Sequence, residues 1–390
     1  MKILMVLERE FPPDDRVEKE AVSLIEAGHE VFLACYTMIN RKEFEEYKRI
    51  KIFRKSISKF IYKSSVGCLK FPFYFNFWRN FLNGLFNNGT FDAIHIHDLP
   101  LVQVGLELKQ KYKIPLVFDM HENYPAALEI SIHTNTFPGN LFHSSKQWRD
   151  YEIKSLEQSD YVIAVIEEMR DRISRLGIKD EKIIIVPNTP DIDKLEVFNN
   201  ECDKDKITLF YAGGLNIHRG LQVVIKGLRR VIKEHPNIRL WIVGSGSYQS
   251  FLEALVKESG LDEVVQFLGW KSQQELFKLL NKSDIALIPH LKSEQTDHSS
   301  PNKLYQYLYY GKPIISSDCN SVKRILKEAG GGVFYSSGSP ESFSNALTLL
   351  IEKGKTERSI KTGEKLIIDK YNWEKTVEPL LQIYQALKVQ

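Results

Sequence analysis

The sequence predicts an α/β protein built from two doubly wound domains, in which helices cover both faces of a parallel sheet. Short apolar runs alternate with amphipathic helical patterns over most of the 390 residues. These runs are continuous rather than interrupted by polar residues, which is typical of strands buried on both faces. The length points the same way, because the chain exceeds one compact core and suits two domains of about 150–200 residues each.

The first domain is predicted over residues 1–190. Its first strand, 3–7, is a short apolar run that ends before Glu8, and the helix over 16–26 stops at Gly28. Further strands are predicted at 30–34, 93–97, 115–118, 161–165 and 182–186, with helices at 100–111, 145–158 and 167–176. Strands that alternate with crossover helices pair in parallel, so this order predicts a parallel sheet.

A polar segment without clear periodicity, 191–206, is predicted to link the domains. The alternation restarts in a second domain over 207–370, with strands at 208–212, 239–243, 264–268, 285–288 and 313–316. Helices are predicted at 219–233, 248–258, 272–280, 301–310 and 340–353. An amphipathic helix over 373–388 follows, and we expect segment 371–390 to cross back to the first domain. Since open α/β sheets bind ligands beyond the carboxyl ends of their strands, we expect both domains to face one cleft.

Composition and charge exclude several classes of function. The chain carries 53 Lys and Arg against 50 Asp and Glu, and its net charge of +3 argues against a dedicated nucleic-acid binder. Its four cysteines have neither metal-ligand nor redox spacing, which indicates free thiols in a reducing cytoplasm. The N-terminal apolar run is too short for a signal peptide, and no apolar stretch approaches the length of a membrane-spanning helix.

Two glycine-rich loops follow strands of the second domain. In the first, Gly213 and Gly214 follow the strand, and Arg219 lies where a helix is expected to begin. Glycines let the backbone approach an anion, the helix start supplies N–H donors, and arginine adds a bidentate donor. A tight turn with a surface arginine is the alternative. In the second loop, packing of strand against helix explains Gly244 and Gly246 more simply than phosphate binding.

A long polar loop precedes the helix predicted at 301–310. Ser300 is a good N-cap residue, Pro301 a good first helical residue, and Gly311 a stop signal. The unpaired N–H groups at this helix start, together with the Lys303 side chain, predict an anion site. Gln306 lies on the same helix face and can reach a hydroxyl beside a bound phosphate.

Several short motifs occur in order along nearly the whole chain. They include Asp15-Arg-Val-Glu-Lys-Glu-Ala, Gly28-His-Glu-Val, His95-Ile-His97-Asp98, Asp119-Met-His121-Glu122, Val243-Gly-Ser-Gly246, Phe267-Leu-Gly269-Trp270, Pro301-Asn-Lys-Leu-Tyr-Gln306-Tyr and Tyr371-Asn-Trp373-Glu. In this order and spacing the chain resembles the family 4 glycosyltransferases. These are retaining, nucleotide-sugar-dependent enzymes with two Rossmann-like domains facing a cleft, the GT-B architecture.

The resemblance implies that the second domain binds the nucleotide-sugar donor. It assigns the diphosphate to Gly213, Gly214, Arg219, Asn302 and Lys303, the donor sugar to Glu294, His298, Ser299 and Ser300, and the ribose and base to Gln306, Gly244, Gly269 and Trp270. The chain departs from the family where Gly214 replaces an arginine and where His298 and Gln306 replace a pair of glutamates. Lys303 then supplies phosphate charge lost at Gly214, and Glu294 can substitute for the missing sugar-binding glutamate.

In the first domain, the resemblance places His121 against the donor sugar and the reaction centre, with Glu122 beside it. A histidine and a carboxylate at a strand end also suit acid–base work or hydroxyl binding. Arg16 and His97 are assigned to the acceptor side. The implied reaction is front-side transfer without a metal ion or other cofactor, in which the leaving diphosphate helps to deprotonate the acceptor. His95 and His97 share a strand face, but no further ligand clusters with them in the sequence, so we expect no metal there.

Residues 48–91 form a basic and aromatic block, with nine Lys or Arg, twelve aromatic residues and no Asp or Glu. One interpretation is binding to an anionic membrane surface, where each cation contributes about 1 kcal/mol. The other is a core helix with a basic, solvated face.

The sequence therefore predicts a transferase that moves a hexose-type sugar from a nucleotide diphosphate to a glycan or lipid-linked glycan, with retention of configuration. We expect it in the cytoplasm, at the inner face of the plasma membrane if the block binds lipid, and in polysaccharide or cell-envelope synthesis. Two alternatives remain: a nucleotide-sugar 2-epimerase or a hydrolysing relative of the same architecture, and, from another functional class, a catalytically silent partner subunit that binds a sugar nucleotide.

Overall fold

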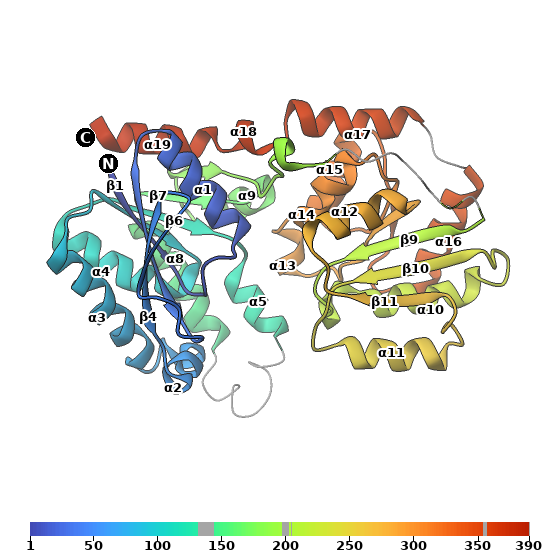
Figure 1. Ribbon diagram of the computed structural model, residues 1–390, viewed down its shortest axis with the longest axis horizontal. Helices are drawn as coiled ribbons and strands as arrows, with labels where there is room; N and C mark the ends of the chain where they lie inside the picture. The colour runs from blue at the N-terminus through green and yellow to red at the C-terminus, as the bar shows by residue number, and fades with distance from the viewer. Residues whose placement is uncertain (132–143, 197–202, 204, 354–356, 390) are drawn as a thin grey trace. The chain divides into compact units, whose positions relative to one another are not determined.

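The computed structural model describes residues 1–131, 144–196, 203, 205–353 and 357–389 (Figure 1). The chain divides into two compact units, the first made of Met1–Pro187 with Val377–Gln390 and the second of Asn188–Thr376. The predicted linker, 191–206, contains one short 3-10 turn, η4 (Ile192–Lys194), and its residues 197–202 and 204 lie outside the described residues.

The first unit is built on an eight-stranded sheet with the order β3-β4-β2-β1-β5-β6-β7-β8. Its strands are β1 (Lys2–Leu7), β2 (Glu30–Thr37), β3 (Phe44–Tyr47), β4 (Ile50–Ser56), β5 (Ala93–His97), β6 (Leu116–Met120), β7 (Tyr161–Ala164) and β8 (Ile183–Ile185). Neighbouring strands are parallel except β3 and β4, which are antiparallel. The sequence pattern did not predict the edge strand β3 or its neighbour β4, because charged residues interrupt their apolar runs.

Within the described residues, seven α-helices connect the strands of the first unit: α1 (Asp15–Glu26), α2 (Lys59–Lys63), α3 (Phe73–Asn88), α4 (Val102–Tyr112), α5 (Tyr124–Ile130), α8 (Ser145–Gln158) and α9 (Glu167–Arg175). The basic and aromatic block therefore forms β4, α2 and α3 rather than one helix. One face of α3 is core, since Tyr74, Trp78 and Leu82 are buried. Arg54 on β4 is buried too and pairs with Glu45, so it is unavailable to a membrane.

The C-terminal segment returns to the first unit and adds a further helix to it. The single helix predicted over 373–388 is two helices, α18 (Trp373–Thr376) and α19 (Glu378–Val389). Pro379 explains the interruption, because it has no N–H with which to continue the hydrogen-bond ladder. Residues 377–390 belong to the first unit, where the Tyr384 hydroxyl is 3.1 Å from Nδ1 of buried His95.

The second unit has a six-stranded, wholly parallel sheet with the order β11-β10-β9-β12-β13-β14. The strands are β9 (Ile207–Ala212), β10 (Ile238–Val243), β11 (Val265–Gly269), β12 (Ile285–Ile288), β13 (Ile314–Ser317) and β14 (Val333–Tyr335). The helices are α10 (Leu221–Val231), α11 (Gln249–Glu258), α12 (Gln273–Lys282), α13 (Glu294–Asp297), α14 (Asn302–Tyr309), α15 (Asn320–Glu328), α16 (Pro340–Lys353) and α17 (Glu357–Asp369), besides α18.

Successive residues of β9 face two different cores, which confirms the doubly wound arrangement of the second unit. Leu209 and Tyr211 pack into the core that contains α10, α11 and α16. Phe210 and Ala212 pack into the core that contains α12, α14 and α15. Figure 1 shows α11 and α12 on opposite sides of this sheet. Among the described residues, no helix combines the length and apolar character needed to cross a membrane.

Candidate functional site

Lys303 is the centre of a polar cluster at the strand ends of the second unit. It is the second residue of α14, and its Nζ is shielded from solvent without a hydrogen-bond partner, 4.1 Å from the ring centroid of Tyr211. Gly213 leaves room for it, because a Cβ there would lie 2.7 Å from Nζ. Burial and the positive charge of Arg219 hold the pKa of Lys303 well below its usual range. A buried cation without a counter-charge is costly, so this arrangement suits an anionic ligand.

Arg219 ends the 3-10 turn η5 (Ile217–Arg219), which follows β9. Its Nη1 donates to Nε2 of His290 at 2.8 Å, while its Nε is buried without a partner. Burial and the charges of Lys303 and Arg219 hold the pKa of His290 well below its usual range, so this ring stays neutral and accepts the hydrogen bond. The predicted helix start at Arg219 is wrong by two residues, because Gly220 turns the chain with φ +74° before α10 begins.

The loop before α14 places Ser300 beside the helix start without using it as a cap. Pro301 occupies the N-cap position in an extended conformation, and the Ser300 Oγ is buried without a partner. The predicted N-cap role of Ser300 is therefore wrong, because α14 begins one residue later, at Asn302, which is exposed. His298 is the C-cap residue of α13, and its Nδ1 lies 2.6 Å from the carbonyl oxygen of Glu294. The carbonyl oxygen of Ser299 accepts from Ser321 Oγ at 2.6 Å.

Glycines hold the loops after β9, β10 and β11 against each other. A Cβ at Gly244 would lie 2.1 Å from the Gly213 carbonyl oxygen, and the Gly244 N–H donates to Gly269 O at 2.8 Å. Close packing does explain Gly244, but of loop against loop rather than of strand against helix as predicted. Gly269 lies next to exposed Trp270. Gly214 accepts through its carbonyl oxygen from the Tyr211 hydroxyl at 2.9 Å, so the loop closes over the ring that lies against Lys303.

Gln306 lies one turn after Lys303 on α14 and is half-buried. Of the predicted donor-site residues, the structure brings together Gly213, Arg219 and Lys303.

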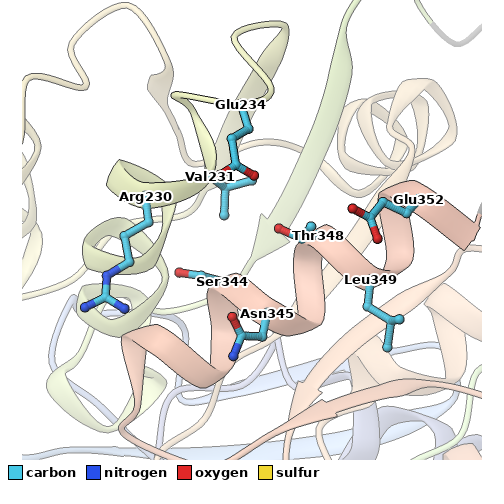
Figure 2. A pocket seen from close by; sticks show the side chains of 8 residues that line it. All are labelled: Arg230, Val231, Glu234, Ser344, Asn345, Thr348, Leu349 and Glu352. Atoms are coloured by element: carbon cyan, nitrogen blue, oxygen red, sulfur yellow. The ribbon is translucent and has the colours of Figure 1, made fainter.

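The second unit also has a hollow of about 360 Å³, which lies away from this cluster (Figure 2). It is lined by Arg230 at the end of α10, by Glu234 in the turn that follows, and by α16. The end of α10 leads into the amino end of β10, so this hollow is at the opposite edge of the sheet from Lys303.

Asp119 is the centre of a second polar cluster, at the strand ends of the first unit. It lies on β6 and is fully buried. Arg16 donates to it from Nε at 3.1 Å and from Nη2 at 2.7 Å, and donates from Nη1 to the Val186 carbonyl oxygen at 2.9 Å. His97 Nδ1 and His121 Nε2 lie 3.2 Å and 2.7 Å from Asp119 Oδ2. Burial alone would raise the pKa of Asp119, but the charges of Arg16 and His121 outweigh it and hold the pKa well below its usual range.

His121 follows β6 and is the member of this cluster that reaches the surface, with 15% of its side chain exposed. Burial opposes its positive charge, but Asp98 and Asp119 outweigh burial and raise its pKa to about 9. Asp98 is held with φ +66°, a conformation that costs a non-glycine residue about 1–3 kcal/mol and is concentrated at functional sites. An imidazole that is protonated at neutral pH favours a role as hydrogen-bond donor over that of general base. Glu122 follows His121 and is half-buried.

Glu20 and His95 lie beside this cluster and bear on the question of a metal ion. Together with His97 and Asp119 they form a buried group whose ligand atoms lie within 4.8 Å of one another. The premise that no further ligand joins the two histidines is therefore wrong, because α1 and β6 bring two carboxylates to them. However, Arg16 Nη2 lies 3.0 Å from Glu20 Oε1 and 2.7 Å from Asp119 Oδ1. Arg16 already compensates the charge of Asp119, and burial raises the pKa of Glu20 to about 8, so Glu20 is protonated at neutral pH. This favours a self-paired network over a metal site.

Arg16 and His97 do not present their side chains to an acceptor, contrary to the prediction. Arg16 is 4% exposed and His97 is fully buried. Both instead contact Asp119, a residue of the Asp119-Met-His121-Glu122 motif for which no role was predicted from the sequence. The spacing of Asp119 and His121 was the available signal, since residues i and i+2 of a strand point to the same face. His290 had a weaker signal, its position directly after a predicted strand.

Two family models together span almost the whole chain. The model described as glycosyltransferase family 4 matches residues 17–194, and the model described as glycosyl transferases group 1 matches residues 193–383. An uncharacterized glycosyltransferase of Methanocaldococcus jannaschii is 23% identical over 99% of this chain and 98% of its own length.

Two solved structures resemble the fold over the whole chain. Sucrose-phosphate synthase from Thermosynechococcus elongatus has a TM-score of 0.81 at 16% identity, covering 100% of this chain and 99% of its own. Anabaena HepE in complex with UDP and glucose has a TM-score of 0.74 at 15% identity, with 100% of both chains covered. At these identities the likeness establishes the two-domain GT-B fold.

Proposed function

Because the chain belongs to the family 4 glycosyltransferases, we propose that it transfers a hexose-type sugar from a nucleotide diphosphate to a glycan or lipid-linked glycan, with retention and without a metal ion. The observation that supports this donor class is the cluster around Gly213, in which Lys303 Nζ and Arg219 Nε are buried without partners. A diphosphate supplies the negative charge that these groups lack. The resemblance to HepE in complex with UDP and glucose makes uridine nucleotides the first donors to test.

In this proposal the second unit holds the donor and stabilises the leaving group. The bond between the anomeric carbon and the diphosphate oxygen breaks, and the acceptor oxygen bonds to the same face of the sugar. The acceptor proton passes to the leaving phosphate. Arg219 and Lys303 stabilise the charge that develops on the diphosphate, which is the electrostatic contribution that a site without a metal needs. His290 keeps Arg219 oriented by accepting from its Nη1.

Calorimetric titration with UDP and UDP-glucose tests the donor site. We expect Lys303→Met and Arg219→Met each to raise Kd about 10- to 100-fold, since a charged hydrogen bond contributes about 1.5–3 kcal/mol. Lys278→Met is the matched control, because Lys278 is exposed on α12 and should leave Kd unchanged. If no nucleotide diphosphate sugar binds, or if both variants bind like the wild type, the donor assignment is wrong.

Product analysis then separates the reaction from its alternatives. Transfer with retained anomeric configuration, unchanged by a chelator, supports the proposal. A donor that binds but is never consumed with any acceptor would instead support the silent partner subunit. Conversion of the donor to its 2-epimer without an acceptor would support the epimerase.

We further propose that the acceptor is reached at an anionic membrane surface, through an aromatic and basic surface on α2 and α3. Phe60, Phe71 and Phe73 are 65%, 43% and 45% exposed. Phe60 and Phe73 have ring centroids 5.6 Å apart, and those of Phe71 and Phe73 are 6.3 Å apart. The lysines in and beside this segment, Lys59, Lys63 and Lys70, are exposed as well. Exposed aromatic rings flanked by cations suit the interface of an anionic bilayer.

Sedimentation with vesicles tests this surface. We expect binding to vesicles rich in phosphatidylserine, little binding to neutral vesicles, and a loss of binding in the double variant Phe60→Ser, Phe73→Ser. Phe251→Ser is the matched control, because Phe251 is 49% exposed on α11 of the other unit. Equal sedimentation with anionic and neutral vesicles would contradict the membrane proposal and leave the donor proposal untouched.

A further inference from the structure

The two ring nitrogens of His121 have different surroundings. Nε2 lies 2.7 Å from Asp119 Oδ2, within hydrogen-bond distance. Nδ1 lies 3.6 Å from Asp98 Oδ2, beyond the range of a good hydrogen bond. Since the ring is partly exposed and Nε2 is engaged inward, Nδ1 is the ring atom left to meet a ligand.

Asp119, the carboxylate within hydrogen-bond distance of His121 Nε2, is itself held in place by Arg16. Arg16 binds both oxygens of Asp119 and anchors its third nitrogen to the Val186 carbonyl oxygen. Arg16 belongs to the first turn of α1, which is held by the Asp14 side chain accepting from the Val17 N–H at 3.1 Å. A planar guanidinium held at three acceptors leaves Asp119 little freedom to rotate.

We propose that Arg16 and Asp119 are positioning residues for the transfer reaction, which hold the His121 ring so that its Nδ1–H donates to an oxygen of the bound substrate. The inference rests on the proposed function, because it assigns the substrate of the transferase to this face of His121. Asp119 orients the ring and compensates its charge, and Arg16 keeps Asp119 in place. Neither residue touches the substrate.

The ionisation of His121 follows from the groups that face it. They are Asp98 and His97 from β5 and its following loop, Asp119 from β6, and Arg16 and Glu20 from α1. His97 is neutral, since burial lowers its pKa, and burial raises the pKa of Glu20 to about 8. The two aspartates therefore decide the charge of His121. The donor form is present below its pKa of about 9 and is lost as the pH rises through that value.

NMR titration of ring-labelled histidine in the full-length protein tests the arrangement without any substrate. We expect His121 of the wild type to titrate near pH 9. In Asp119→Asn we expect its pKa to fall towards the ordinary value of about 6.5. Glu152→Gln is the matched control, because Glu152 and Arg172 form another buried bidentate pair in this unit, on α8 and α9. That variant should leave the His121 pKa unchanged.

Kinetic measurements complete the test, with the nucleotide-sugar donor that the calorimetric titration identifies. We expect Asp119→Asn to lower kcat about 100-fold, as loss of one transition-state donor does, with little change in KM. Its activity should also decline from a lower pH than that of the wild type. Arg16→Lys keeps the charge and should retain more activity than Arg16→Met.

Two results would overturn the positioning role: a wild-type His121 that titrates at or below its ordinary pKa, or a folded Asp119→Asn variant with unchanged His121 pKa and pH profile. The wild-type titration decides the matter even where a variant does not fold. If the expected NMR shifts occur but no sugar is transferred, the proposed function fails and the Arg16–Asp119–His121 arrangement stands.

Discussion

At the scale of single residues, two lysines of the second unit show how the surroundings of an amino group separate a structural role from the proposed binding role. Lys312 is 7% exposed, and its Nζ donates to the carbonyl oxygens of Asn281 and Ser283 at 2.7 Å and 2.8 Å. Lys303 Nζ is equally shielded but has no acceptor. The first lysine satisfies the fold, whereas the second keeps its hydrogen-bonding capacity for a ligand.

Lys303→Met should therefore stabilise the ligand-free protein while weakening nucleotide binding. The unfolded chain protonates this lysine below about pH 10.4, but the folded chain resists protonation because burial lowers the Lys303 pKa. The free energy of unfolding of the wild type should thus rise with pH between the lowered pKa of Lys303 in the folded chain and its pKa of about 10.4 in the unfolded chain. The part of this pH dependence that comes from Lys303 should be absent in the variant. Urea unfolding over about pH 6–10 measures it, with the largest gain from the substitution at the low end.

Lys312→Met is the contrasting control for this prediction. It should destabilise the protein by about 1–3 kcal/mol, because two buried carbonyl oxygens lose their donor. We therefore expect the two variants to change the free energy of unfolding in opposite directions. A destabilising Lys303→Met would mean that Lys303 has a structural role in the free protein.

At the scale of elements, the start of α10 depends on a close backbone approach. Gly220 has φ +74°, and a Cβ there would lie 1.7 Å from the Pro289 carbonyl oxygen. This contact packs the turn that carries Arg219 against the loop after β12, which carries His290. The anion site is therefore assembled by two loops whose approach requires a glycine.

Gly220→Ala should lower the free energy of unfolding by about 2–4 kcal/mol, from left-handed strain plus a backbone clash. Gly260→Ala is the control, because Gly260 has φ +66° but open space around the added Cβ. It should cost only the conformational strain, about 1 kcal/mol. Denaturant unfolding measures both, and equal losses would show that the contact with Pro289 adds nothing.

At the scale of the whole molecule, the chain ends in the unit where it begins. Leu380 and Tyr384 of α19 are fully buried, and Ile383 and Leu387 nearly so. The first unit therefore needs a segment that is separated from it in sequence by the entire second unit. The free energy of unfolding of the first unit therefore depends on residues 377–390 as well as on residues 1–187.

Deletion of residues 377–390 should unfold the first unit. Burial of each large apolar side chain contributes about 1.5–3 kcal/mol, and four of them approach the total stability of a typical domain. Tyr384→Phe removes only the hydrogen bond to His95 and should cost about 1–2 kcal/mol. Thermal unfolding of both variants measures the difference, and a truncated chain that melts like the wild type would contradict the assignment of α19 to the first unit.

Local sequence patterns were enough to predict most of the core elements. The apolar runs of β1, β9 and β12 and the glycine after α1 are legible because hydrophobic periodicity and turn residues act over a few neighbours. The edge strand β3 and its neighbour β4 were missed because their charged residues interrupt the apolar pattern. The three groups gathered at the proposed donor site, Gly213, Arg219 and Lys303, were predictable, since Gly213 and Arg219 lie in the loop after a predicted strand and Lys303 lies at the start of a predicted helix.

The sequence by itself determined the two-domain α/β class, the order of most strands and helices, and which loops carry the groups of the proposed anion site. Only the tertiary structure decided that Arg16 supports Asp119, that Glu20 joins the two histidines, and that the last helix returns to His95. Arg16 and Asp119 are 103 residues apart, and Tyr384 and His95 are 289 apart. Local periodicity carries no information about such contacts, because they depend on which strands become neighbours in the sheet and on which side chains lose water together.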